Sequence, residues 1–408
     1  MKILRITPHY YFEAHNWPSR FDPMGGMQVQ ITNLSEWLAK KGIEQDVLTT
    51  GMPGVPRIVN SLENLTVHSV RTMTLPVKSK YTGTLFLDQS WFLGALKWII
   101  KNGRNRKYDA IHVHASGVVW PLLAASFAQK YLNKPLFLSI HCSRNFTYHP
   151  MNSWDKWIHS RVKSYELKAM QQSDKVILLT KKRMDSYEKV LQNNSNLLEV
   201  GDCIAPHHLQ HPIDCPNCRL LREGLGSYRN VVFLGRIAHE KGWHAFLNVA
   251  KELASRLDNL RFIVCGDGPQ RKQMEEEIAK CGLQHQFRIT GFISNKTVSC
   301  YLQQAHVMVL PSQHEEFGGS LLEATVAGVP IIATCNGGPA DIFVNGKTGI
   351  LKDPKDIAGM AEEAYRILSD PMAGNELLRN ASREVVPRFL PDRVYANYVE
   401  LYGKYNQK

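Results

Sequence analysis

Long apolar runs are missing from this sequence. None reaches the roughly 18 residues that a membrane-spanning helix needs, and the first segment, "MKILRI", reads as a buried strand rather than as a secretory signal. Short-period repeats, low-complexity tracts and coiled-coil heptads are also missing. The sequence therefore predicts a globular protein, and we expect it to be cytoplasmic.

Three motifs that would indicate other kinds of protein are missing as well. No GxGxxG follows the first predicted strand, which disfavours a nicotinamide-dependent dehydrogenase. No DxD-type motif offers carboxylates to a metal. No dense stripe of basic and aromatic residues accompanies the net charge of +12, which disfavours a nucleic-acid-binding module. The positive charge then indicates a small anionic ligand or an anionic membrane surface.

Cysteine is scarce, with 8 in 408 residues at irregular spacing, mostly inside apolar strand-like runs. Such a pattern is typical of reduced thiols in a core rather than of a disulfide framework. One pair, Cys215 and Cys218, has the CxxC spacing of zinc ligands, and Cys203 with three histidines lies just upstream. Because a second spaced pair is absent, we expect no bound metal; whether Cys203, Cys215 and Cys218 bind zinc stays open.

The length of the chain exceeds what one hydrophobic core usually organises, so two domains are expected. Apolar runs alternate with helical patterns from "MKILRIT" to "DKVILLT", and the series restarts at "VVFLGR". This alternation predicts two α/β, Rossmann-like domains with parallel sheets. We place them at residues 1–205 and 206–389, with a linker region at about 203–228 and a C-terminal helix, 390–408, that packs back on the first domain.

Ligands of doubly wound sheets bind at the carboxyl ends of the strands. In the first domain one such end leads to Gly25 and Gly26 before an amphipathic helix. There glycine would let backbone N–H groups approach a phosphate or sugar, although an ordinary turn explains the pair equally well. Two other strands end near His112 and His114, and near His141. We predict a sugar hydrogen bond for His114 and a core role for His112.

The second domain combines cations with carboxylates. Arg236 follows a strand and Lys241 lies five residues on, beside a glycine, which suits a clamp for a diphosphate; a solvated basic loop is the alternative. Glu315 follows a later strand, and Glu323 lies one turn inside the next helix. Backbone amides at the start of that helix would hold phosphate oxygens, while the carboxylates accept sugar and ribose hydroxyls.

Together these segments resemble a known family. "GRIAHEKG", "GDGP", "PSQHEEFGGSLLEA" and "GGPADIFVNGKTGIL" resemble the retaining nucleotide-sugar glycosyltransferases with the GT-B fold, over nearly the whole chain. The most specific element is the E-x7-E pair of Glu315 and Glu323. Two positions depart from the family: Glu316, where proline is common, and Asp341, where glutamate is usual. The resemblance implies two Rossmann-like domains that face each other across a cleft.

Segments of the first domain indicate a narrower group. "WPSRFDPMGGMQVQI", "DQSW" and "SIHCSR" are similar to the 2-deoxystreptamine glycosyltransferases of aminoglycoside antibiotic biosynthesis. That resemblance implies transfer of N-acetylglucosamine or glucose from a UDP-sugar to 2-deoxystreptamine, giving 2'-N-acetylparomamine in the first case. A dicationic acceptor needs acidic partners, which the acidic residues of these segments would supply. The alternative is that these acidic residues only balance nearby basic residues at the surface. The acceptor-binding residues implied are Asp22, Gln28, Asp88, His141 and Arg144.

The resemblance also implies a mechanism. The acceptor hydroxyl attacks on the face from which UDP departs, the leaving phosphate takes its proton, and no cofactor, metal or enzyme nucleophile is needed. The alternative is a GT-B glycosyltransferase that acts on a lipid or polysaccharide acceptor at a membrane surface. In either case we expect no nucleic-acid partner and no stable membrane insertion. The donor would be bound by Gly25, Gly26, Arg236, Lys241, Gly318, Gly319, Ser320, Leu321 and Glu323, with Arg236, Lys241, Glu315 and His114 as the catalytic set.

Overall fold

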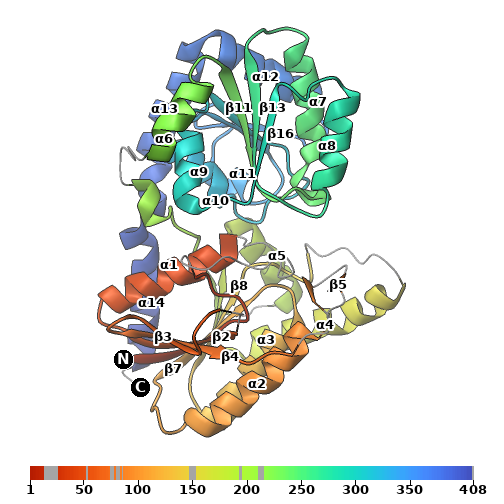
Figure 1. Ribbon diagram of the computed structural model, residues 1–408. Helices are drawn as coiled ribbons and strands as arrows, with labels where there is room; N and C mark the ends of the chain where they lie inside the picture. The colour runs from red at the N-terminus through yellow and green to blue at the C-terminus, as the bar shows by residue number, and fades with distance from the viewer. Residues whose placement is uncertain are drawn as a thin grey trace. The chain divides into compact units, whose positions relative to one another are not determined.

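The computed structural model describes residues 1–12, 26–51, 54–73, 78–79, 83–84, 86–146, 153–192, 195–209 and 216–406. The chain forms two compact units, Met1–Gly201 with Asp392–Lys408, and Asp202–Pro391. Each is an α/β unit built on one main sheet (Figure 1). The first unit ends at Gly201, a few residues before the domain end expected from the sequence, and the return to it begins at Asp392.

The first unit is built on an eight-stranded sheet in the order β10-β9-β8-β7-β1-β2-β4-β3. The pairs are parallel except for β3, which runs antiparallel to β4 at the edge. The strands are β1 (Lys2–Ile6), β2 (Glu44–Thr50), β3 (Ile58–Leu62), β4 (Leu65–Val70), β7 (Ala110–Ala115), β8 (Leu136–Ile140), β9 (Lys175–Leu178) and β10 (Leu197–Glu199), with β5 (Lys78–Ser79) and β6 (Gly83–Thr84) as a separate pair.

Helices cover both faces of this sheet. Successive side chains of a strand point to opposite faces, and because the strands are apolar on both faces, both must be covered. Leu4 and Ile6 of β1 pack with Trp91 of α2 and with α3, whereas Arg5 points to the opposite face. On that opposite face Ile31 of α1 packs on β2 and β4. The helices are α1 (Gly26–Lys40), α2 (Leu87–Asn102), α3 (Val119–Leu132), α4 (Ser153–Gln172), α5 (Lys181–Leu191) and α14 (Pro391–Asn406).

The last helix, α14, packs on the first unit although it follows the second unit in sequence (Figure 1). Trp37 of α1 donates its indole N–H to Asp392 at 3.0 Å, and its ring lies tilted against that of Tyr395. Tyr402 is fully buried against Phe137 of β8. Aromatic residues at helical spacing thus give α14 an apolar stripe that the first unit covers.

The second unit has a six-stranded, all-parallel sheet in the order β13-β12-β11-β14-β15-β16. Its strands are β11 (Arg229–Leu234), β12 (Leu260–Cys265), β13 (Phe287–Gly291), β14 (Val307–Leu310), β15 (Ile331–Thr334) and β16 (Ile350–Lys352). Its helices are α6 (Pro216–Leu225), α7 (Trp243–Ala254), α8 (Arg271–Lys280), α9 (Asn295–Leu302), α10 (Gly319–Val326), α11 (Pro339–Ile342), α12 (Ile357–Ser369) and α13 (Pro371–Glu384), with short 3-10 turns η1 (Pro206–Leu209), η2 (His239–Lys241) and η3 (Val386–Phe389).

Each sheet has a point where the strand order reverses. In the first unit this switch lies between β1 and β7, and in the second between β11 and β14. Loops at the carboxyl ends of such neighbouring strands diverge to opposite faces, which leaves a crevice where ligands of open α/β sheets bind. The site in each unit is therefore expected beside these strand pairs.

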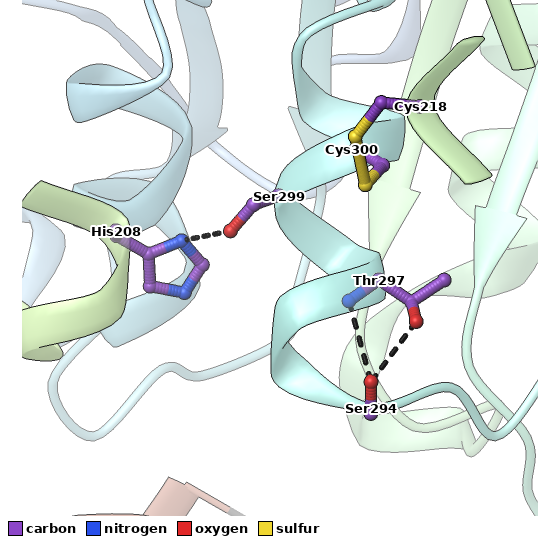
Figure 2. Close-up of a disulfide and its surroundings, with 6 residues drawn as sticks. All are labelled: His208, Cys218, Ser294, Thr297, Ser299 and Cys300. Carbon is purple, nitrogen blue, oxygen red and sulfur yellow. Dashed lines mark hydrogen bonds between the residues drawn. A yellow bond between two sulfur atoms is a disulfide. The ribbon is translucent and has the colours of Figure 1, made fainter. Parts of the chain in front are cut away.

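The region predicted as a linker, 203–228, belongs to the second unit and contains η1 and α6. Cys218 of α6 forms a disulfide with Cys300 of α9, with Cα atoms 4.9 Å apart (Figure 2). The prediction that the cysteines are reduced core thiols is therefore wrong for these two. The bond also removes Cys218 from any set of zinc-binding thiolates, while Cys215 lies outside the described residues.

Candidate functional site

Two cations predicted to clamp a diphosphate lie together in the loop after β11. Arg236 donates to Glu240, and Lys241 lies at the end of η2. Burial works to raise the pKa of the Glu240 carboxyl, but the charges of Arg236 and Lys241 outweigh it and the pKa is lowered. Both cations thus act on the Glu240 carboxylate. Because their loop follows the C-terminal end of β11, their positive charge lies at that edge of the sheet.

Glu315 joins this loop to the loop after β14. Its Oε2 lies 2.7 Å from Nζ of Lys241, and Ser312 Oγ lies 3.4 Å from the same oxygen. The Glu315 residue is 9% exposed, and its backbone N–H donates to the carbonyl of Asn336 beyond β15. The predicted sugar-binding carboxylate is therefore also the partner of a predicted catalytic cation.

Two glycines allow these loops to approach. Gly242 has φ +73°, and a Cβ there would lie 1.9 Å from the carbonyl oxygen of Pro311. Gly337 has φ +101°, and a Cβ there would lie 1.9 Å from the carbonyl oxygen of Glu315. Only glycine tolerates both the left-handed backbone and this proximity. The pairing of Lys241 with Glu315 depends on this contact between loops.

The helix α10 begins at Gly319 as predicted, after Gly318 with φ +105°. The first N–H groups of a helix have no partner within it, which suits Gly319 and Ser320 for binding an anion. Leu321 was also predicted to contact the sugar donor. Its side chain is fully buried, and its backbone N–H donates to the Gly318 carbonyl at 3.0 Å. Glu323 follows one turn in, with its side chain 24% exposed.

His208, noted in the sequence only among the histidines of a possible zinc site, lies beside Glu323. His208 Nε2 lies 3.6 Å from Glu323 Oε1, and His208 Nδ1 lies 2.7 Å from Ser299 Oγ (Figure 2). Burial raises the pKa of Asp202 to about 8, and the charge of Glu323 adds to the effect. The irregular segment around His208 gave no periodic signal, and it is the packing of η1 on α9 and α10 that brings this histidine to Glu323.

In the first unit the predicted histidines form one buried chain of hydrogen bonds. His114 Nε2 lies 2.7 Å from an Arg5 nitrogen, and His114 Nδ1 lies 2.9 Å from His141 Nε2. His112 is fully buried, in line with its predicted core role. His114 is 1% exposed with both ring nitrogens bonded, so the predicted sugar contact would require this chain to rearrange.

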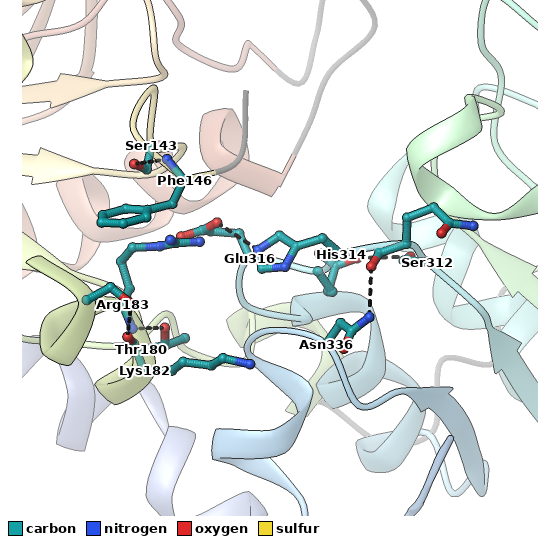
Figure 3. A network of polar contacts seen from close by, with 12 residues as sticks. Ser143, Phe146, Thr180, Lys182, Arg183, Ser312, His314, Glu316 and Asn336 are labelled. Carbon is teal, nitrogen blue, oxygen red and sulfur yellow. Dashed lines mark hydrogen bonds and ion pairs between the residues drawn. The ribbon is translucent and has the colours of Figure 1, made fainter. Parts of the chain in front are cut away.

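The loop after β8 carries Arg144 and is fixed by a buried carboxylate. Glu166 of α4, 1% exposed, accepts from the backbone N–H of Arg144 at 2.9 Å and from the hydroxyl of Tyr187. Ser143 Oγ accepts from the N–H of Phe146, whose ring lies against the guanidinium of Arg183 (Figure 3). Glu166 was missed because its contacts are with residues more than 20 positions away.

The remaining acceptor-binding candidates are spread over two helices. Gln28 lies in the first turn of α1 and Asp88 in the first turn of α2. Burial raises the pKa of Asp88 to about 6. Gly26 is exposed at the start of α1, whereas Gly25 and Asp22 lie outside the described residues.

In the described part of the chain, no group of three or more His, Cys, Asp and Glu side chains is arranged to hold a metal ion. Within the same residues, no helix is both long enough and apolar enough to cross a bilayer.

Known proteins that resemble this chain cover both units. Residues 24–196 match Glycosyltransferase Family 4, and residues 224–385 match Glycosyl transferases group 1. The 2-deoxystreptamine N-acetyl-D-glucosaminyltransferase of Niallia circulans is 62% identical over 93% of this chain and 98% of its own length. This chain is a glycosyltransferase. The 2-deoxystreptamine glucosyltransferase of Streptomyces kanamyceticus is 36% identical over 85% of this chain and 90% of its own.

Solved structures relate the fold of this glycosyltransferase to the GT-B class. Sucrose-phosphate synthase of Thermosynechococcus elongatus superposes with a TM-score of 0.82 at 20% identity, over 99% of this chain and 98% of that one. A glycosyltransferase involved in lipopolysaccharide biosynthesis superposes with a TM-score of 0.71 at 16% identity, over 98% and 99%. The predicted family and the predicted GT-B fold are confirmed.

The two positions at which the sequence departs from the usual residues of the family it resembles both lie in the second unit. Glu316 Oε2 lies 3.2 Å from Nε2 of His314 (Figure 3). Asp341 lies in the short helix α11. A glutamate at 316 can thus pair with a histidine two residues before it, which proline cannot do.

The disulfide of this glycosyltransferase gives a first testable result. Alkylation of the denatured protein before and after reduction should differ by two cysteine adducts, because Cys218 and Cys300 become available only on reduction. Reduction should also lower the free energy of unfolding by about 2–4 kcal/mol, since the bond closes a long loop. In a Cys218→Ser, Cys300→Ser double variant both differences should vanish. Equal adduct counts for the native protein would contradict the disulfide.

Proposed function

We propose that this enzyme transfers N-acetylglucosamine, or glucose, from a UDP-sugar to 2-deoxystreptamine with retention of configuration. The observation that carries the proposal is the 62% identity to a 2-deoxystreptamine N-acetyl-D-glucosaminyltransferase over 98% of that relative. Such identity over the full length favours a shared acceptor. For the donor sugar we propose either N-acetylglucosamine or glucose, because the relatives include both an N-acetylglucosaminyltransferase and a glucosyltransferase.

In this proposal the second unit binds the donor. Arg236 and Lys241 bind the diphosphate; the ammonium of Lys241 has three N–H donors, of which the bond to Glu315 uses one. The amides at the start of α10 bind phosphate oxygens, and Glu323 accepts the ribose hydroxyls. The cations neutralise the charge that develops on the leaving UDP, so we propose that no divalent metal is needed.

The first unit would bind the acceptor. Transfer with retention places the attacking hydroxyl on the face from which UDP leaves, where a phosphate oxygen takes its proton. The C–O bond to UDP breaks as the new glycosidic C–O bond forms, so no covalent enzyme intermediate is required. The ammonium groups of 2-deoxystreptamine would be met by carboxylates, of which Asp88 is the described candidate.

The test is a donor panel with one acceptor. Purified enzyme is incubated with 2-deoxystreptamine and UDP-N-acetylglucosamine, UDP-glucose or UDP-galactose, and the products are identified by mass spectrometry and anomeric NMR. An α-linked product with a mass increase of one N-acetylhexosamine or hexose supports the proposal. Transfer only to lipid or polysaccharide acceptors, or a β-linked product, would overturn it.

Acceptor binding should depend on pH through Asp88. Burial raises the pKa of this carboxyl to about 6, so the anion that attracts an ammonium forms as the pH rises through that value. The KM for 2-deoxystreptamine should fall about tenfold between roughly pH 5 and pH 7, the size of one charge-assisted hydrogen bond. Steady-state kinetics with saturating donor measures it.

The matched control is Asp88→Asn, which keeps the shape of the side chain but cannot ionise. This variant should lose the pH dependence of the acceptor KM while the donor KM keeps its wild-type profile. A wild-type acceptor profile in Asp88→Asn would remove Asp88 from the acceptor site.

A further inference from the structure

His208 is a buried histidine of the second unit that has no part in the mechanism above. It lies in η1, where its backbone N–H donates to the carbonyl of Ala205 at 2.9 Å. Ring nitrogen Nδ1 lies 2.7 Å from Oγ of Ser299 (Figure 2). Ring nitrogen Nε2 lies 3.6 Å from Oε1 of Glu323. The imidazole is therefore placed between α9 and the carboxylate proposed to bind the ribose.

The ring is attached to a fixed part of the unit. Ser299 of α9 is buried, and the next residue, Cys300, is bonded to Cys218 of α6 (Figure 2). Both α9 and α10 pack on η1. Because the backbone of His208 and its Nδ1 are each tied to a buried group, the ring has little freedom to turn. Its Nε2 thus keeps one place beside α10.

Glu323 is the less restricted partner of this pair. Its side chain is 24% exposed, and a glutamate has several side-chain torsions that a ligand must fix when it binds. A carboxylate accepts the 2'- and the 3'-hydroxyl of a ribose together only when its plane faces them. A neighbour that fixes one carboxylate oxygen before the nucleotide arrives removes part of this ordering cost.

The charges beside Glu323 suit such a contact. The separation of 3.6 Å exceeds a hydrogen bond, so the attraction is electrostatic. It requires a hydrogen on Nε2, as in the Nε2–H tautomer or the imidazolium; Nδ1 then accepts from the Ser299 hydroxyl in the first case and donates to it in the second. Burial raises the pKa of Asp202 to about 8, so at pH 7 that group is mostly protonated and adds little negative charge beside Glu323.

We propose that His208 is a positioning residue that acts through Glu323: its Nε2 holds the carboxylate in the orientation that accepts the ribose hydroxyls. The role of Glu323 rests on the proposed function, whereas the contact between the two side chains does not. His208 need not touch the nucleotide, in agreement with its 2% exposed side chain. Loss of the Nε2 contact should therefore weaken nucleotide binding and leave the KM for the acceptor unchanged.

Two substitutions of His208 separate its contact with Glu323 from its contact with Ser299. The amide nitrogen of Gln falls near Nε2 of the ring, and that of Asn near Nδ1. In isothermal titration calorimetry, His208→Gln should keep the Kd for UDP within about twofold of wild type, whereas His208→Asn should raise it about three- to tenfold. A larger loss in His208→Gln would show that the residue acts through Ser299 as part of the fold, and equal values in the two variants would also overturn the proposal.

A double-mutant cycle tests whether the effect passes through Glu323. In the Glu323→Ala background, His208→Asn should change the Kd for UDP by less than about twofold, because the carboxylate that it positions is gone. The same loss in both backgrounds would mean that His208 acts on the nucleotide or on the fold without Glu323, and it overturns the proposal.

The outcomes distinguish this proposal from the proposed function. If the wild type binds UDP and Glu323→Ala weakens that binding, unchanged affinity in His208→Asn removes only the role given to His208. If either condition fails, the donor site of the proposed function fails, and the role of His208 with it. Thermal unfolding checks that each variant folds. Should His208→Asn not fold, His208→Gln decides, because a structural role through Ser299 predicts a loss of UDP affinity in that variant and a contact with Glu323 predicts none.

Discussion

Replacing Lys241 with alanine should lower kcat by about 10²–10³-fold while the KM for the acceptor changes little. The reason is that its ammonium stabilises charge that develops on the departing diphosphate, and removal of one such donor typically costs about 2.7–4 kcal/mol of transition-state stabilisation. Arg236→Ala should fall in the same range. The measurement is steady-state kinetics with each substrate varied in turn.

Controls separate this loss from a loss of ion pairing. Arg256 pairs with Glu362 as Arg236 pairs with Glu240, and Lys347 pairs with Glu384 at the same 2.7 Å as Lys241 with Glu315. Alanine variants of Arg256 and Lys347 should keep wild-type kcat. Thermal unfolding of Lys241→Ala checks that the unpaired Glu315 has not disrupted the unit. Wild-type turnover in Lys241→Ala and Arg236→Ala would place the diphosphate elsewhere.

The second large effect is expected for Glu323. Its carboxylate lies one turn inside α10, with its side chain partly exposed, and accepts the ribose hydroxyls in the proposed donor complex. Glu323→Ala should weaken UDP binding by roughly 10- to 100-fold, because hydrogen bonds to a charged group contribute about 1.5–3 kcal/mol. Isothermal titration calorimetry with UDP measures it.

The ligand provides the control for Glu323. With 2'-deoxy-UDP the wild-type enzyme should already have lost part of this affinity, and Glu323→Ala should weaken it by less than it weakens UDP. Such non-additivity is the mark of a direct contact between the two groups that are removed. If Glu323→Ala weakens both ligands equally, Glu323 acts on the fold of α10 and not on the ribose.

The candidate site residues of the second unit were proposed from the sequence because the signals for them are local. Arg236, Lys241 and Glu315 each follow a strand, and Glu323 follows a glycine turn into a helix; strand ends and glycine turns are readable from short windows. Their partners were not readable. The 2.7 Å contact of Lys241 with Glu315 joins residues 74 positions apart and depends on two strands being neighbours in the sheet.

The first unit shows the same division. His112, His114 and His141 were recognised from their place at the ends of apolar runs, but the buried contacts of His112 are with Arg5 and Tyr402, 107 and 290 positions away. An arginine inside an apolar strand gives no sign of its partner. Register between β1 and β7, and the return of α14, bring these groups together.

The sequence by itself determined the α/β class, the restart of the strand series in a second unit, the glycosyltransferase family and most residues at the strand ends, because hydrophobic period, turn residues and short motifs are local properties. Only the tertiary structure decided that Cys218 and Cys300 are bonded, that Glu323 lies beside His208, and that Arg5 meets His112 and His114 in the core. Those features depend on distances between groups far apart in the chain, which packing and strand order fix and which no local pattern encodes.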